Sequence, residues 1–203
     1  MLRQLVVGFV TAAAIGSTTL AQSAMAEPMN VRGTIASFSD RSLKVKTREG
    51  ETADIALAEG AMFSGVSRAA ITDIKPGNYV GIASLPMKDG GSGALEVLIF
   101  PPALKGAGEG SFGWDLKPQS TMTNATVADA VKGVDGRTVT VTYHGKEKKI
   151  TIPEGTPVVT LAPATKADLK SGAVVFVPVE KSTDNSLTAK QVVVGTNGVV
   201  PPM

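Results

Sequence analysis

The chain of 203 residues contains no cysteine, and this absence excludes several kinds of site. Without thiols there is no disulfide, no thiolate-bound metal and no cysteine nucleophile. A lipid anchor attached through cysteine is excluded as well. Stability must therefore come from the burial of a hydrophobic core.

Histidine and aromatic residues are almost as scarce. His144 is the only histidine, so no histidine pair exists for a typical zinc, copper or haem site. Aromatic residues make up 4% of the chain, and Val, Ile, Leu and Ala must fill the core. We expect His144 to be an exposed residue at a hairpin tip. The sequence predicts no metal site, no cofactor and no catalytic residue.

Long hydrophobic runs are also missing, because a membrane-spanning helix needs about 20 apolar residues. The short apolar run Leu5 to Gly16 follows Arg3 and precedes the small residues Ala24 to Ala26. This arrangement is typical of a signal peptide. We therefore expect residues 1–26 to be removed by cleavage near Ala26, leaving a periplasmic or secreted protein with no membrane span.

The formal net charge of +2 is too small by itself to favour nucleic acid or an anionic membrane. Two basic groups on predicted hairpins are weak candidates for anion binding: Lys44, Lys46 and Arg48, and Lys146, Lys148 and Lys149. No exposed aromatic side chain accompanies them for stacking on bases. We therefore expect solvated strand faces, and nucleic acid is not an expected partner.

The two halves of the chain repeat each other at a fixed offset. "DIKPG" begins at Asp73 and "DLKSG" at Asp168, and 168 − 73 = 95. The same offset aligns further apolar pairs: Ile55 with Ile150, Val80 with Val175, and Val97 with Val192. Duplication of one structural unit explains these matches.

Upstream the offset is 96, aligning Leu43 with Val139 and Val45 with Val141. The extra residue falls in a predicted hairpin loop, where Arg48-Glu49-Gly50 in the first copy corresponds to the two-residue turn His144-Gly145 in the second. This register places three pairs opposite each other: Lys44 and Asp54, Leu43 and Ile55, and Val139 and Ile150.

Each copy is predicted to hold five strands, with a short helical turn between the third and fourth. The expected strands span residues 31–38, 42–47, 52–57, 78–85 and 94–100 in the first copy, and 126–133, 137–143, 147–152, 173–179 and 187–194 in the second. In the second copy Thr165 and Asp168 resemble a capping box, and Gly172 resembles a left-handed helix stop.

This pattern predicts an all-β protein made of two tandem five-stranded OB-like barrels. The expected organisation is a signal peptide (1–26), a first barrel (27–102), a Gly/Pro-rich connector (103–125) and a second barrel (126–203). Because Asp73 and Asp168 are explained by turn formation, we do not interpret them as catalytic.

The first copy contains Val31-Arg32-Gly33-Thr34-Ile35, then Leu43 and Val45, then "DIKPGNYV" and "ALEVLIF". This pattern resembles a bacterial domain family of unknown function with an OB-like barrel. The middle of the chain, "GEG…WDL…STMTNATV", and its "PPM" end resemble a group of exported proteins with two such domains. The resemblance implies an OB-like fold for each copy and carries no established activity.

The connector is the most unusual segment, because it holds the only tryptophan, Trp114, beside Phe112. Two interpretations remain open: these aromatics plug the seam between the barrels, or they line a ligand groove or dock a partner. The candidate binding residues are Phe112, Trp114, Asp115 and Glu109.

The sequence predicts a non-enzymatic binding or interaction protein, whose partner is an unidentified envelope ligand or protein. One alternative is a cell-envelope hydrolase that uses the carboxylates Glu109 and Asp115. Another is an accessory protein that binds anionic ligands through its basic hairpins.

Overall fold

The computed structural model describes residues 27–88, 90–129 and 137–201. The expected signal peptide and its cleavage site lie outside these residues. The described chain consists of strands and three-residue 3-10 segments, and none of its helices is long and apolar enough to cross a membrane.

The elements fall in the following chain order. The strands are β1 (Glu27–Ser39), β2 (Ser42–Thr47), β3 (Thr52–Arg68), β4 (Tyr79–Pro86), β5 (Ser92–Ile99), β6 (Gly110–Gly113), β7 (Thr121–Asp129), β8 (Thr138–Tyr143), β9 (Lys146–Thr151), β10 (Val158–Pro163), β11 (Val174–Lys181) and β12 (Leu187–Gly195). The 3-10 segments are η1 (Ile71–Asp73), η2 (Pro102–Leu104) and η3 (Lys166–Asp168).

Five strands close a barrel, which we call the first lobe. Around the barrel the order is β1–β2–β3–β12–β11, and β11 returns to β1. All neighbours are antiparallel except β3 and β12. Alternate apolar residues point inward, so that Ile35, Leu43, Val45 and Val177 are almost completely buried in one core.

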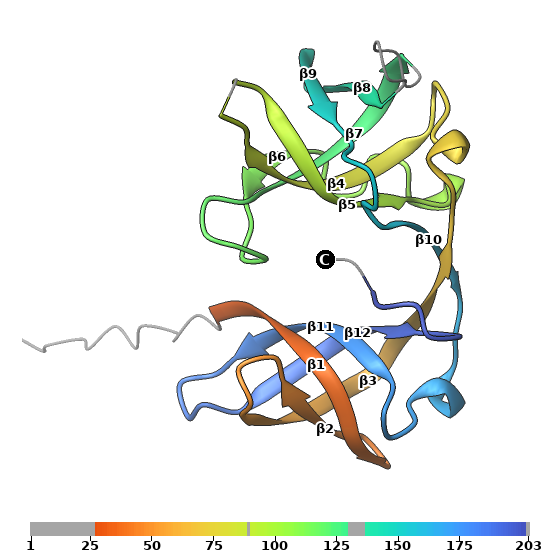
Figure 1. Cartoon of the computed structure of the whole chain (residues 1–203). Coiled ribbons are helices and arrows are strands. Elements are labelled where there is room, and N and C mark those ends of the chain that lie inside the picture. Colours follow the sequence, from red (N-terminus) through yellow and green to blue (C-terminus); the bar gives the residue numbers. More distant parts are fainter. Residues whose placement is uncertain (1–26, 89, 130–136, 202–203) are drawn as a thin grey trace, which may run out of the picture.

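The extra strands form a second lobe with the same kind of pairing. The order is β7–β8–β9–β5–β4, with β4 paired back to β7 and a short parallel contact between β5 and β9. Its own core contains Val80, Ile82, Val139, Val141 and Ile150. β10 pairs with both β3 and β5, and these strands join the two lobes along one side of the molecule (Figure 1).

The prediction that each copy closes its own barrel is wrong. The first three strands of the first copy, β1 to β3, pair with the last two strands of the second copy, β11 and β12. Likewise β7 to β9 pair with β4 and β5. The expected bounds 27–102 and 126–203 therefore describe the repeat in the sequence but not the pairing of the strands.

The length of β3 accounts for this exchange. We expected a strand ending at residue 57, but β3 continues to Arg68 and carries the chain out of the first lobe. Its last residues, Ser64 to Arg68, pair with β10. The chain then enters the second lobe at η1 and β4, so the fourth strand of the copy forms at a distance from the first three.

The predicted hairpin registers are confirmed. Lys44 pairs with Asp54 and Leu43 with Ile55, and Lys44 Nζ lies 3.2 Å from Asp54 Oδ1. Val139 pairs with Ile150 across a two-residue turn. In that turn His144 and Gly145 have φ values of 46° and 72°, as the tight hairpin turn with two left-handed residues requires.

At the expected helical turns the structure has the 3-10 segments η1 and η3. The N–H of Thr165 donates to Asp168 Oδ2 at 2.8 Å, and Thr165 Oγ1 accepts from the N–H of Ala167 at 3.2 Å. Gly172 follows with a φ of 87°. These bonds explain why "DIKPG" and "DLKSG" recur, because each segment redirects the chain into the next strand.

A third apolar cluster lies between the lobes. It contains Val66, Leu98, Val159, Phe176 and Val193, which come from both lobes and from the crossing strands. Trp114 and Phe100 pack against it. The seam is therefore a packed interface, and the connector contributes to it.

Candidate binding site at the aromatic connector

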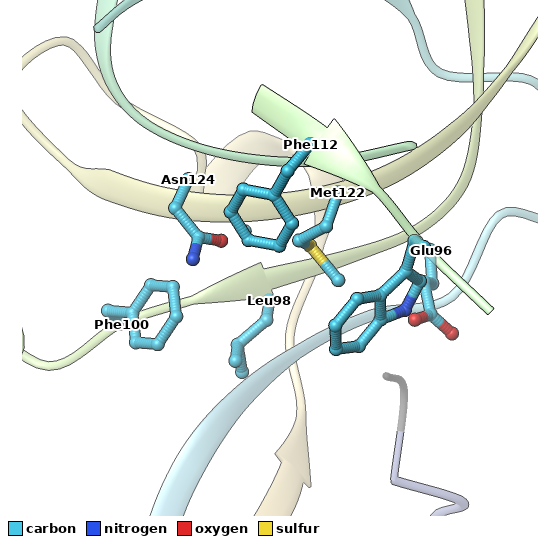
Figure 2. A pocket seen from close by; sticks show the side chains of 8 residues that line it. Glu96, Leu98, Phe100, Phe112, Met122 and Asn124 are labelled. Atoms are coloured by element: carbon cyan, nitrogen blue, oxygen red, sulfur yellow. The ribbon is translucent and has the colours of Figure 1, made fainter. Parts of the chain in front are cut away.

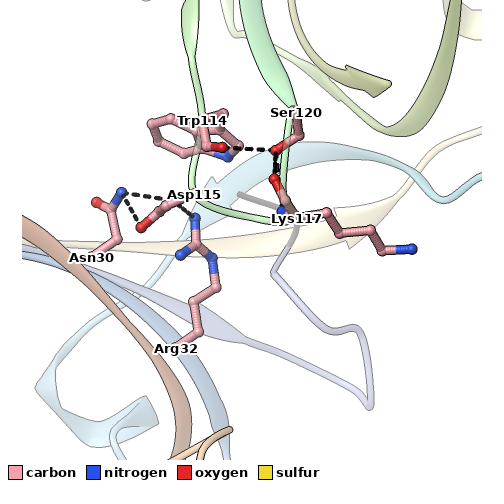
Figure 3. Close-up of polar contacts among 6 residues, drawn as sticks. All are labelled: Asn30, Arg32, Trp114, Asp115, Lys117 and Ser120. Atoms are coloured by element: carbon pink, nitrogen blue, oxygen red, sulfur yellow. Dashed lines mark hydrogen bonds and ion pairs between the residues drawn. The ribbon is translucent and has the colours of Figure 1, made fainter. Parts of the chain in front are cut away.

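The connector forms a β-hairpin whose tip reaches from one lobe to the other. β6 pairs with the start of β7 in the second lobe. At the tip, the N–H of Trp114 donates to the carbonyl of Ser120 at 2.8 Å. Ser120 Oγ lies 2.8 Å from the carbonyl oxygens of Trp114 and Lys117 (Figure 3). Ser120 thus holds the loop 114–120 in a fixed shape.

Asp115 attaches this loop to β1 of the first lobe. Arg32 Nη2 donates to Asp115 Oδ1 at 2.7 Å, and Asn30 Nδ2 lies 3.1 Å from both carboxylate oxygens (Figure 3). Desolvation raises the pKa of Asp115, but the hydrogen bond and charge of Arg32 and the hydrogen bond of Asn30 together lower that pKa below 3.8. The carboxylate is therefore charged at neutral pH, which strengthens both hydrogen bonds.

Arg32 also binds the connector through its guanidinium face. Its Cζ lies 5.5 Å from the ring centre of Trp114 and 5.0 Å from that of Phe176. Both distances are in the range of cation–π attraction. The side chain of Arg32 is only 8% exposed, so this contact is largely shielded from water. Arg32 thus contacts both Trp114 and Asp115 and helps to fix them to the first lobe.

A hollow of about 80 Å³ lies beside Trp114 and under Phe112. The residues that line it are Gly81, Glu96, Leu98, Phe100, Phe112, Trp114, Met122 and Asn124. Figure 2 shows Leu98 and Phe100 facing Phe112 and Met122, with Asn124 and Glu96 at opposite ends. Phe112 remains 43% exposed, so it forms a wall of the hollow and leaves it open to solvent.

Gly81 explains why this hollow exists. Gly81 pairs with Asn124 between β4 and β7, and Phe176, 95 positions later (176 − 81 = 95), pairs with Arg32 between β11 and β1. The second lobe therefore has no side chain where the first has a phenyl ring. A Cβ at Gly81 would lie 2.9 Å from Asn124 Oδ1 and 3.1 Å from Phe100 Cε2.

The indole nitrogen of Trp114 is the most informative polar atom of this site. Trp114 Nε1 is buried and has no hydrogen-bond partner among the residues that the structure describes. A buried N–H without an acceptor costs about 1–3 kcal/mol. Because the atom is buried, a ligand would have to displace the side chains that cover it before its acceptor pairs with the N–H and recovers part of that cost.

Glu109 does not join the other three candidates. Its Oε1 accepts a hydrogen bond from the N–H of His144 at 2.8 Å, at the turn between β8 and β9. Nearby, Tyr79 donates to the carbonyl of Ala107 at 3.0 Å. Burial, and then the charge of Glu109, raise the pKa of Tyr79. Glu109 thus fastens the start of the connector to the second lobe and does not line the hollow.

The basic hairpin residues are not brought together, because Lys44, Lys46 and Arg48 belong to the first lobe and Lys146, Lys148 and Lys149 to the second. Lys148 differs from the others because its half-buried Nζ donates to hydroxyl groups. Its distances are 3.1 Å to Thr123 Oγ1, 3.3 Å to Thr121 Oγ1 and 3.4 Å to Ser111 Oγ. Burial lowers the pKa of Lys148.

Sequence reasoning missed Arg32, Asn30 and Gly81. Arg32 and Asp115 are separated by more than eighty residues, and no local pattern links them. The sequence contains only a weak indication of the hydroxyl groups around Lys148. Thr121 and Thr123 are two positions apart on one strand and therefore share a face.

Within residues 27–88, 90–129 and 137–201, no cluster of three His, Cys, Asp or Glu residues is suited to hold a metal ion. Comparison with known proteins found no matching family model, no similar curated protein and no similar solved structure. The interpretation of the site therefore depends on its own geometry.

Proposed function

We propose that the protein is a non-enzymatic binding protein of the cell envelope, exported after removal of residues 1–26, and that it binds an aromatic ring in the hollow under Phe112. The observation that carries this proposal is the position of Phe112 and Trp114. Phe112 is 43% exposed over an apolar hollow, whereas a seam plug would bury its ring. Trp114 agrees in part with both interpretations of the connector. It packs on Phe176 of the first lobe, as a seam plug would, and it also lines the hollow.

The proposal includes the fold of both lobes. We propose that each lobe is an OB-like barrel in which the first three strands come from one copy of the repeat and the last two from the other. The equivalent order of pairing in the two lobes supports this reading. The connector then lies across the two barrels, where a ligand would contact both.

The lining of the hollow defines the chemistry of the ligand. Leu98, Phe100 and Met122 offer apolar walls, which favour a flat ring over a charged group. Trp114 Nε1 offers one unpaired donor. We therefore propose an aromatic ring that carries a neutral acceptor such as a carbonyl oxygen, either as a small molecule or as part of a larger ligand.

The geometry gives less support to the two alternatives. A hydrolase with Glu109 and Asp115 would require both carboxylates to face one substrate, but Glu109 is bonded to the N–H of His144 and Asp115 to Arg32 and Asn30. An accessory protein that binds one anionic ligand through both basic hairpins would need the two hairpins at one site, but they belong to different lobes, and Lys44 is paired with Asp54.

Saturation-transfer NMR with acetophenone and ethylbenzene tests the proposed function. The two probes are similar in size, but only acetophenone carries an acceptor. We expect acetophenone to bind at least about fivefold more tightly, because about 1 kcal/mol is gained when the indole N–H is paired. Phe112→Ala should weaken binding about tenfold, since one wall of the hollow is removed.

Met62→Ala is the matched control, because Met62 is also an exposed apolar side chain, at 64%, but does not line the hollow. It should leave the affinity unchanged. The proposal is wrong if neither probe binds, or if Met62→Ala weakens binding as much as Phe112→Ala.

A further inference from the structure

A second, larger hollow of about 500 Å³ lies between the two lobes. We call it the inter-lobe cleft. Its lining consists of Arg48, Arg68, Ala69, Glu96, Gly155, Thr156, Pro157, Val158, Val159, Gly198, Val199, Val200 and Pro201. Only Glu96 also lines the hollow under Phe112. The two cavities are therefore neighbours with different walls.

Two arginines reach this cleft from different places in the sequence. Arg48 begins the turn between β2 and β3, and its N–H donates to the carbonyl of Arg32 at 3.0 Å, which fixes the turn against β1. Arg68 is the last residue of β3 and pairs with Val159 on the crossing strand β10. Both side chains are exposed, but both are carried by anchored backbone.

The charges on the described residues that line the cleft are not balanced. Neither Arg48 nor Arg68 forms a salt bridge with any residue in the described ranges. The guanidinium group stays charged in proteins, and its fork of donors fits the two oxygens of a phosphate or carboxylate. Glu96, which is 8% exposed, is the only acidic residue of the described lining. Two cations and one acid thus share the cleft.

We propose that the inter-lobe cleft binds an oxyanion, a phosphate or carboxylate group, through Arg48 and Arg68. Val158, Val199 and Pro201 provide apolar surface beside the two arginines, so the remainder of the ligand can be apolar. Arg48 belongs to the first lobe, and Arg68 is the last residue of β3, where this strand leaves the lobe. A bound anion would therefore hold the end of β3 against the first lobe. This site is separate from the proposed aromatic site.

Calorimetric titration with inorganic pyrophosphate and with citrate tests this proposal. The double variant Arg48→Gln/Arg68→Gln should weaken binding of the preferred probe at least about tenfold, because two charge-assisted contacts are lost. The control Lys46→Gln/Lys149→Gln removes the same charge from exposed residues outside the cleft and should change the affinity less than about twofold. Tighter binding of pyrophosphate would assign the site to phosphates, and tighter binding of citrate to carboxylates.

The proposal is overturned if wild type binds neither probe, or if the control variant weakens binding as much as the arginine variant. Circular dichroism checks that each variant is folded. If the double variant does not fold, the titration is repeated with Arg48→Gln alone, because the side chain of Arg48 is exposed in a turn. Unchanged binding by this single variant would then refute the proposal. Retained acetophenone binding in the arginine variants would show that the two sites are independent.

Discussion

Val66 and Leu161 pair directly with each other between β3 and β10. They are equivalent positions of the repeat, since 161 − 66 = 95. On either side, Gly65 pairs with Ala162 and Ser67 with Thr160. The two copies are therefore related by an approximate twofold axis near this pair. Each copy sends its chain across the axis, and this crossing accounts for the exchange of strands between the lobes.

The exchange predicts how the chain behaves when it is cut in the exposed segment before β6. The fragments 27–105 and 106–203 each lack strands of both lobes. Alone, neither should show cooperative urea unfolding, because no complete core can form. An equimolar mixture should regain the circular dichroism spectrum and the unfolding transition of the intact chain. Cooperative unfolding of one isolated fragment would show that a copy can close its own barrel.

Asp115→Asn should loosen the connector, because the charge that holds Arg32 is lost. Asp115 is 49% exposed, so we expect the free energy of unfolding to fall by about 1 kcal/mol or less. The pKa of Asp115 is lowered in the folded state. Its contribution is therefore present above pH 3.8 and is lost as the pH falls toward the folded-state pKa.

Urea unfolding of wild type and Asp115→Asn from pH 7 to pH 2.5 measures this dependence. The two stabilities should converge at the acid end. Asp54→Asn is the control, since it removes one side of the exposed Lys44–Asp54 pair and should have a smaller effect. A difference between wild type and Asp115→Asn that is constant over the whole pH range would contradict the assignment.

Lys148→Met should leave the stability at neutral pH unchanged or raise it by up to about 1 kcal/mol. Lys148 is half-buried, and no carboxylate of the described chain forms an ion pair with it. The hydroxyl groups that lose Lys148 as a donor in this variant keep other hydrogen bonds, because Ser111 bonds to Thr123 and Ser84 to Thr121.

The effect of Lys148→Met should also depend on pH. Burial lowers the folded-state pKa of Lys148. The buried charge therefore lowers the free energy of unfolding by its full amount below that pKa, and this destabilisation disappears as the pH rises toward 10.5. The advantage of the variant should shrink between pH 7 and pH 10.5 in thermal unfolding. A loss of more than about 1 kcal/mol at pH 7 would mean that the hydrogen bonds of Lys148 outweigh its burial.

Gly81→Ala should destabilise the protein by about 1–3 kcal/mol, because its Cβ would collide with Asn124 and Phe100. The same methyl group should also reduce acetophenone binding by narrowing the hollow. Gly113→Ala is a matched control on β6, since a Cβ there meets no atom within 4 Å. Chemical denaturation of both variants checks the prediction, and equal stability of Gly81→Ala and wild type would refute it.

The sequence predicts local structure well because local structure depends on neighbouring residues. The pairing of Leu43 with Ile55 and of Val139 with Ile150 follows from apolar alternation and loop length alone. The all-β class follows from the same patterns. The exchange of strands between the copies does not follow from these patterns. β1 can pair with the fourth strand of either copy, because both copies offer similar apolar faces.

The candidate site was predictable in part for the same reason. The rarity of aromatic residues pointed to Phe112 and Trp114, and both line the hollow. The residues that position them are distant in sequence, as with Arg32 and Asp115. The role of Gly81 could not be predicted either. The sequence does not show that Phe176, at the equivalent position of the first lobe, places a ring where Gly81 leaves space in the second lobe.

The proposed function requires that Trp114 lines an open site whose ligand accepts a hydrogen bond from its indole N–H. The chain has one tryptophan, so its ¹H–¹⁵N spectrum contains a single indole cross-peak. During titration with acetophenone, this peak should shift progressively and saturate, and ethylbenzene should shift it much less. An indole peak that stays in place up to saturating acetophenone would show that no such hydrogen bond forms.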